Sequence, residues 1–143
     1  MILWRISNYA TLDGEGGKLF PARWHSRGQA IIYTADHPAS SLCEMLANTD
    51  AGSLPSTFQL LKIAVEDILI LDLKNLIENW IENIMFTRDL GDKWLKEANS
   101  AILRVPSALV PEAYNFLINP VHPDISRIAI ERKIKIPLDP RLR

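Results

Sequence analysis

The stretch Ala22-Arg23-Trp24-His25-Ser26-Arg27-Gly28-Gln29-Ala30-Ile31-Ile32-Tyr33-Thr34-Ala35-Asp36-His37-Pro38 sets the order of the first elements of the fold. Its apolar run at 30–35 predicts a strand. The following Asp36-His37-Pro38 predicts the start of a helix, because Asp caps helices and Pro suits a first turn. We expect this helix to span about 38–47, with Asp36 or Ser40 as its cap.

The predicted helix has an apolar side and a polar side. Its core stripe follows the i, i+3, i+4, i+7 spacing and consists of Ala39, Leu42, Cys43 and Leu46. Glu44 falls away from that stripe, on the side shared with Ser40, where a carboxylate is usually a solvated helix residue. The stripe also predicts that Cys43 is a small buried hydrophobe rather than a nucleophile.

Outward from this segment, strands and helices follow one another irregularly. The expected strands are 2–6, 58–65, 68–73, 102–105, 108–110, 114–118 and 128–136, and the expected helices are 75–84 and 88–98. The inner face of the second helix would consist of Leu90, Trp94, Leu95 and Ala98. Because strands do not alternate one by one with helices, we expect a single compact α+β domain, residues 1–143, with a mixed or antiparallel β core flanked by helices.

Composition excludes several classes of protein. The 143 residues carry 16 Lys and Arg against 17 Asp and Glu, and 48% of them are apolar. This is typical of a globular domain and argues against nucleic-acid binding, which depends on clustered positive charge. No apolar run approaches the roughly 20 residues of a membrane span, and the first residues lack the pattern of a signal peptide. We therefore expect a cytoplasmic protein without membrane contact.

Common catalytic motifs are missing from the sequence. The glycines of Asp13-Gly14-Glu15-Gly16-Gly17 match no phosphate-binding fingerprint and predict a flexible surface loop. The single cysteine and the three histidines have no metal-ligand spacing, and there is no Gly-x-Ser-x-Gly elbow. No metal site is expected.

Several polar residues in the first third have side chains suited to chemistry: Arg5, Arg23, His25, Tyr33 and Glu44. A guanidinium before a glycine turn suits bidentate phosphate binding, and a tyrosine in an apolar strand can stack on a flat heterocycle. A carboxylate can accept a hydrogen bond from a sugar hydroxyl. Each also has a structural alternative: a surface ion pair, a half-buried strand tyrosine or a solvated carboxylate. Taken one by one, the residues favour the structural alternatives.

Taken in order, these residues resemble the RES-domain toxins of RES–Xre type II toxin–antitoxin systems over nearly the whole chain. The similar segments are Leu3-Trp4-Arg5-Ile6-Ser7, the Arg-Trp-x-x-x-Gly-x-x-x-x-Tyr pattern of 23–33, the helix with Glu44, Val105-Pro106-Ser107-Ala108, and Asn119-Pro120-Val121-His122-Pro123. No segment is specific alone, but their order is. The Arg, Glu and Ser that name the family correspond to Arg23, Glu44 and Ser107, with Tyr33 as the aromatic residue.

The resemblance implies a fold similar to ADP-ribosyltransferases and an activity that arrests growth by cleaving the nicotinamide–ribose bond of NAD+. NAD+ would then be a substrate and not a cofactor. The implied catalytic residues are Arg23, Tyr33, Glu44 and Ser107, and the implied NAD+ contacts are Arg5, Arg23, Tyr33, Ser107 and Asn119.

The resemblance also implies a partner, a helix-turn-helix antitoxin of the Xre type. It leaves the acceptor of the ADP-ribose group open, since some relatives transfer it to a protein target instead of water or phosphate. A non-enzymatic binding module is the remaining alternative.

Overall fold

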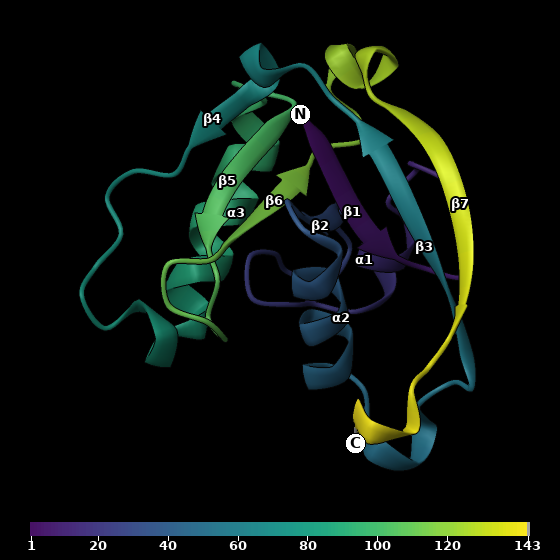
Figure 1. Ribbon diagram of the computed structural model, residues 1–143. Coiled ribbons are helices and arrows are strands. Elements are labelled where there is room, and N and C mark those ends of the chain that lie inside the picture. The colour runs from purple at the N-terminus through teal and green to yellow at the C-terminus, as the bar shows by residue number, and fades with distance from the viewer. Residues whose placement is uncertain (143) are drawn as a thin grey trace.

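The computed structural model describes residues 1–142, and their strands form one sheet of seven (Figure 1). In chain order the strands are β1 (Ile2–Ile6), β2 (Ile32–Ala35), β3 (Thr57–Ala64), β4 (Ile70–Asp72), β5 (Ile102–Pro106), β6 (Tyr114–Ile118) and β7 (Ala129–Pro137). They are arranged in the sheet as β4-β5-β6-β2-β1-β3-β7. All neighbouring strands are antiparallel except β4 and β5, which run parallel. The predicted α+β class with a mixed sheet is confirmed, and Arg143, the last residue of the predicted domain, lies outside the described residues.

Three α-helices accompany the sheet within residues 1–142: α1 (Glu15–Leu19), α2 (Pro38–Ala47) and α3 (Ile84–Glu97). Short 3-10 turns lie at η1 (Ala51–Ser53), η2 (Asp67–Leu69), η3 (Trp80–Glu82), η4 (Pro123–Arg127) and η5 (Pro140–Leu142). In Figure 1, α3 lies behind β5, and β7 forms the outer edge of the sheet beside β3. Helix α2 follows β2 directly and packs on β1 and β2.

The central strand β6 is largely apolar because it buries both of its faces. In β6, Phe116 and Ile118 belong to one apolar cluster, whereas Leu117 between them belongs to the other. The second cluster also contains Trp94 and Leu95 of α3, so this helix covers one face of the sheet. When successive side chains of a strand enter apolar clusters on opposite faces, the strand appears in the sequence as a nearly continuous apolar run. For this reason the predicted bounds of β6 match the observed ones.

The helix predicted over 75–84 is wrong. Asn75 has a φ of 65°, and from 75 to 83 only the short turn η3 is helical. Leu76 and Trp80 pack against the second apolar cluster, whereas Ile77 is exposed. The apolar spacing therefore comes from an irregular segment that contacts the core at separate points. The next helix, α3, begins at Ile84, four residues before the predicted start.

Two further local predictions are corrected. The strand predicted over 108–110 is a turn, because the Ser107 hydroxyl accepts the backbone N–H groups of Leu109 at 3.1 Å and Val110 at 3.2 Å. This local bond competes with a strand ladder. The glycine loop predicted at 13–17 leads instead into the short helix α1, which follows Gly14 in the left-handed region with φ at 68°.

Helix α3 holds the segment before β2 by contacts to its backbone. Thr87 donates to the carbonyl of Arg23 at 2.7 Å, and Arg88 donates to the carbonyl of Ala22 at 2.7 Å. At Gly91 the helix comes so close that a Cβ would lie 1.6 Å from the Trp24 carbonyl oxygen. A glycine is required here for close approach, not for its backbone angles.

We predict that Gly91→Ala lowers the free energy of unfolding by about 1–3 kcal/mol, because the added methyl group overpacks the contact with Trp24. Urea denaturation followed by circular dichroism measures this. Gly16→Ala in α1 is the matched control, since a Cβ there meets nothing within 4 Å. It should change stability by no more than about 1 kcal/mol, in the stabilising direction. Equal stability of the two variants would contradict the close contact.

Candidate active site

A cavity of about 450 Å³ lies where α2 faces the ends of β1 and β2 and the start of β6. Its polar lining consists of Arg5, Arg23, Tyr33, Thr34, Ser41, Glu44, Asn48 and Asn115, and its apolar lining includes Trp24, Met45 and Leu109. Of the residues predicted from the sequence, the cavity thus brings together Arg5, Arg23, Tyr33 and Glu44. Ser107 contacts Glu44 from outside the lining, and Asn119 lies elsewhere.

Helix α2 turns its polar side toward the protein. The bounds of this helix match the prediction, but Ser41 is its buried residue, and Ser41, Glu44, Met45 and Asn48 line the cavity at helical spacing. Ala39 and Cys43 of the predicted core stripe are exposed instead. That prediction, and with it the burial of Cys43, is wrong because the helix covers a polar cavity rather than the apolar core.

Two side-chain bonds orient α2. Ser41 donates to the Trp4 carbonyl at 2.8 Å, which ties the helix to β1. At the start of the helix, His37 caps in place of the predicted Asp36 or Ser40, since its Nδ1 accepts the backbone N–H of Ala39 at 3.1 Å. Both contacts place Glu44 above the cavity.

The Glu44 carboxylate is held at one of its two oxygens. Asn115 Nδ2 donates to Oε1 at 2.9 Å, and the Ser107 hydroxyl lies 3.4 Å from the same oxygen. Within residues 1–142, no protein group bonds to Oε2. The carboxylate is therefore oriented and keeps one oxygen available to the cavity.

Two guanidinium groups share this cavity without an acid partner. Arg5 donates to the Tyr33 carbonyl at 3.0 Å, and Arg23 donates to the Ile81 carbonyl at 3.0 Å. No carboxylate in the described part of the chain forms an ion pair with either arginine. Burial lowers the pKa of the Arg5 guanidinium from its ordinary value. Partly buried guanidiniums with free donors are suited to bind an anionic group.

The Tyr33 hydroxyl is occupied by protein partners. His25, which is only 1% exposed, places Nε2 at 2.9 Å from the Gly17 carbonyl and Nδ1 at 2.7 Å from this hydroxyl. Because a carbonyl only accepts, Nε2 carries the proton and Nδ1 accepts from Tyr33. The hydroxyl in turn accepts the backbone N–H of Trp24 at 3.2 Å, and burial raises the pKa of Tyr33. The aromatic ring of Tyr33, and not its hydroxyl, is therefore available to a ligand in the cavity.

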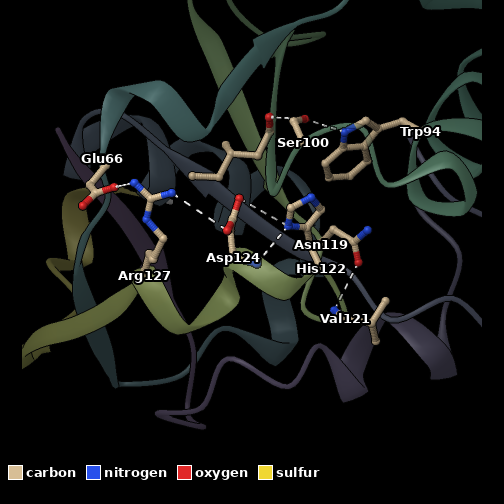
Figure 2. Close-up of polar contacts among 9 residues, drawn as sticks. Glu66, Trp94, Ser100, Asn119, Val121, His122, Asp124 and Arg127 are labelled. Atoms are coloured by element: carbon tan, nitrogen blue, oxygen red, sulfur yellow. Dashed lines mark hydrogen bonds and ion pairs between the residues drawn. The ribbon is translucent and has the colours of Figure 1, made fainter.

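Asn119 has a structural position outside the cavity. It is fully buried; its Nδ2 donates to the Leu95 carbonyl at 3.3 Å, and its Oδ1 accepts the N–H of Val121 at 3.2 Å. Figure 2 shows this side chain turned toward Val121, with His122 and Asp124 beside it. His122 caps the turn η4 by accepting the N–H of Asp124 at 3.0 Å. The Asn-Pro-x-His-Pro segment thus shapes the connection from β6 to β7.

Sequence reasoning missed two contributors to the site. Asn115 interrupts the otherwise apolar run of β6, and a lone amide in a buried strand is a signal that a polar partner is near. Trp80 lies in the stretch predicted as the helix 75–84, yet its ring centroid lies 5.6 Å from that of Trp24 and 5.7 Å from the Arg23 guanidinium carbon. No local pattern marks that second contact, because it joins segments far apart in the chain.

Other kinds of site are not found in the described residues. Within residues 1–142, no group of three His, Cys, Asp or Glu side chains is placed to hold a metal ion. None of the helices there has the length and apolar character needed to cross a membrane.

Comparison with known proteins gives consistent matches across the chain. A family model described as "RES domain" matches residues 2–139. Toxin Res of Pseudomonas putida is 37% identical over 134 residues, covering 92% of each chain. The Prs ADP-ribosylating toxin of Sphingobium sp. is 33% identical over 152 residues, covering 97% of this chain and 94% of that protein. The fold is similar to one in the crystal structure of the M. tuberculosis MbcT–MbcA toxin–antitoxin complex, with a TM-score of 0.74 at 18% identity over 95% of this chain and 84% of that chain.

We predict that Tyr33→Phe destabilises the protein by about 1–3 kcal/mol, because it leaves the buried Nδ1 of His25 and the N–H of Trp24 without a partner. The measurement is the free energy of unfolding in urea. Tyr9→Phe makes the same change at a ring that is 78% exposed and should stay within about 0.5 kcal/mol of the parent. If Tyr33→Phe unfolded with the same free energy as the parent, the structural role of the Tyr33 hydroxyl would be contradicted.

Proposed function

The chain belongs to the RES-domain family, and we propose that it is the toxin of a toxin–antitoxin system that cleaves NAD+ between nicotinamide and ribose. One observation carries this proposal. Arg5 and Arg23, two guanidiniums without an acid partner, share a cavity with the carboxylate of Glu44, which has one free oxygen. Such a site suits a ligand that is anionic at one point and becomes cationic at another.

NAD+ has both features. Its pyrophosphate is anionic, and Arg5 and Arg23 approach the cavity from β1 and from the segment before β2 with donors to spare. At about 450 Å³ the cavity falls within the range of small-molecule sites, roughly 300–1,000 Å³. The two arginines would hold the dinucleotide in one pose, and so place its ribose against Glu44.

The proposed reaction breaks one bond and forms one. The bond between the ribose carbon and the nicotinamide nitrogen breaks, and its electron pair leaves with nicotinamide, which becomes neutral. Positive charge then builds on the ribose, as it does in glycoside cleavage. Glu44 stabilises that charge electrostatically and accepts a bond from a ribose hydroxyl at Oε2. Water or phosphate supplies the oxygen that bonds to the ribose carbon, and the displaced proton passes to solvent.

The other predicted residues take more limited roles. Tyr33 offers its ring to the nicotinamide, since its hydroxyl is engaged with His25 and Trp24. Ser107 acts through Glu44 and through its own turn. Asn119, which lies outside the cavity, has no part in the proposed binding of NAD+.

A second candidate function is transfer of ADP-ribose to a protein side chain. It is favoured by the relative from Sphingobium, which is called an ADP-ribosylating toxin and is 33% identical over 97% of this chain. The same cationic ribose forms in both reactions, so the roles of Arg5, Arg23 and Glu44 stay the same. Only the nucleophile differs. A binding module without enzymatic activity would have no use for this set of groups.

The proposed partner is an antitoxin of the helix-turn-helix, Xre type, and the proposed place of action is the cytoplasm. The similar fold comes from a toxin–antitoxin complex. Beside the cavity, Leu109 and Val110 are each 46% exposed, an apolar edge of the kind that partners cover. An antitoxin bound there would close access to Glu44. The function needs no direct contact with nucleic acid or a membrane.

Glu44→Gln tests the carboxylate directly. We predict that this variant keeps its fold and binds NAD+ but cleaves it about 10²–10³-fold more slowly, because it loses the charge that stabilises the ribose cation. Nicotinamide release by purified, antitoxin-free protein measures the rate. The matched control, Glu78→Gln, changes an exposed glutamate outside the cavity and should keep the parent rate. An unchanged rate in Glu44→Gln would rule out the assignment.

The products decide between the two candidate functions. Free ADP-ribose, or its phosphate adduct, together with nicotinamide would support NAD+ degradation. Nicotinamide released only when a lysate protein becomes labelled with ADP-ribose would support transfer.

The antitoxin and NAD+ should compete. With Glu44→Gln, which leaves NAD+ intact, calorimetric titration of NAD+ into the antitoxin complex should give at least about tenfold weaker binding than titration into the free toxin. Equal affinity in both titrations would show that the antitoxin acts without covering the cavity.

A further inference from the structure

Asn115 lies at the wall of the cavity with little freedom to move. It is 9% exposed, lines the cavity, and sits in β6 between β2 and β5. Its backbone is in register with Ala35 on one side and Val105 on the other. Two ladders therefore fix the point from which its amide reaches the site.

The contact with Glu44 assigns the direction of that amide. A carboxylate oxygen only accepts, so the atom 2.9 Å from Glu44 Oε1 is the NH₂ group of Asn115. The donor is neutral. It orients the carboxylate without cancelling its charge, as a bonded arginine would.

The arginines of the cavity are used differently. Arg5 and Arg23 donate to main-chain carbonyls and form no hydrogen bond or ion pair with Glu44. Together with Tyr33, they are the other titratable side chains in the cavity lining. The charge of Glu44 is thus held in place by Asn115 and, at the longer distance of 3.4 Å, by Ser107.

We propose that Asn115 is a positioning residue of the active site, which holds Glu44 Oε1 so that Oε2, the oxygen left free, faces the ribose of NAD+. This inference rests on the proposed function and adds a residue to it. Asn115 acts through Glu44, whose helix begins three residues after Ala35, the register partner of Asn115. The strand pair and the helix start thus form one rigid frame around the carboxylate.

Two substitutions of Asn115 distinguish a positioning role from a packing role, because the two roles predict opposite orders of activity. Asn115→Asp keeps the shape of the side chain but replaces the donor with a second carboxyl against Glu44. Two carboxyls at this distance share a proton or move apart. The first outcome reduces the negative charge of Glu44, and the second displaces it from the ribose. Asn115→Ala leaves a small gap and no repulsion. If packing mattered most, the Asp variant would be the more active one.

The experiment measures kcat and KM for NAD+ cleavage at neutral pH, per mole of folded protein. We expect Asn115→Ala to lower kcat by about 10–10²-fold, since a misplaced catalytic group has effects of this size. KM should change by less than about threefold, because Arg5 and Arg23 are untouched. The kcat of Asn115→Asp should be at least about tenfold lower than the kcat of Asn115→Ala. If Asn115→Ala does not fold, Asn115→Ser takes its place, since its hydroxyl is too short to reach Glu44.

A second measurement tests the route through Glu44. In the Glu44→Gln background, Asn115→Ala should lower the remaining rate by less than about twofold, because residues that act as a unit are not additive. Ser100→Ala controls for destabilisation: it removes a hydroxyl that bonds Trp94 at 2.9 Å, away from the cavity. It should lower the melting temperature and keep the parent kcat.

The outcomes separate this inference from the proposed function. A parent protein that releases no nicotinamide from NAD+ overturns both. A parent that cleaves NAD+, combined with Asn115→Asp as active as Asn115→Ala or better, or with full additivity in the Glu44→Gln background, overturns the role of Asn115 alone.

Discussion

The rest of the site depends on the contact between α3 and the backbone of the segment before β2. Gly91 lets the helix meet the Trp24 backbone, and Thr87 holds the Arg23 carbonyl. Farther along the helix, Asp92 accepts the Ser26 N–H at 2.9 Å. A segment without strand or helix thereby acquires a fixed path. Arg23 and Trp24 can then face the cavity, because the Arg23 carbonyl is bonded to α3 and the Trp24 N–H to the Tyr33 hydroxyl.

The charged side chains of the cavity are not paired with one another. Arg5 and Arg23 are kept from acid partners, and the carboxylate of Glu44 is bonded to neutral donors. A protein selected for stability alone would pair these charges with one another, since unpaired, partly buried ions are costly. Their separation across one cavity is the physical reason to assign the site to a ligand that carries both kinds of charge.

Several other polar residues stabilise the fold rather than the cavity. His25 and Tyr33 form a buried chain that ends on the Gly17 carbonyl and links α1 to β2. Asn119 and His122 shape the turn between β6 and β7. Their Asn-Pro-x-His-Pro motif is thus explained by bonds to the backbone, while Asn115, which belongs to no expected motif, contacts the Glu44 carboxylate. Position relative to Glu44, and not polarity, distinguishes the two groups.

Local patterns in the sequence were sufficient for the bounds of β1, α2 and β6, because alternation, a proline at a first turn and a continuous apolar run act over neighbouring residues. The order of Arg23, Tyr33, Glu44 and Ser107 was sufficient for the family. The inner face of α2 was not determined in this way. Helical spacing says which residues share a face, but the Trp4 carbonyl that Ser41 meets and the Asn115 amide that Glu44 meets lie 37 and 71 residues away in the chain. Only the tertiary structure brings those partners to α2, and because they are polar, the polar side of the helix became the inner one.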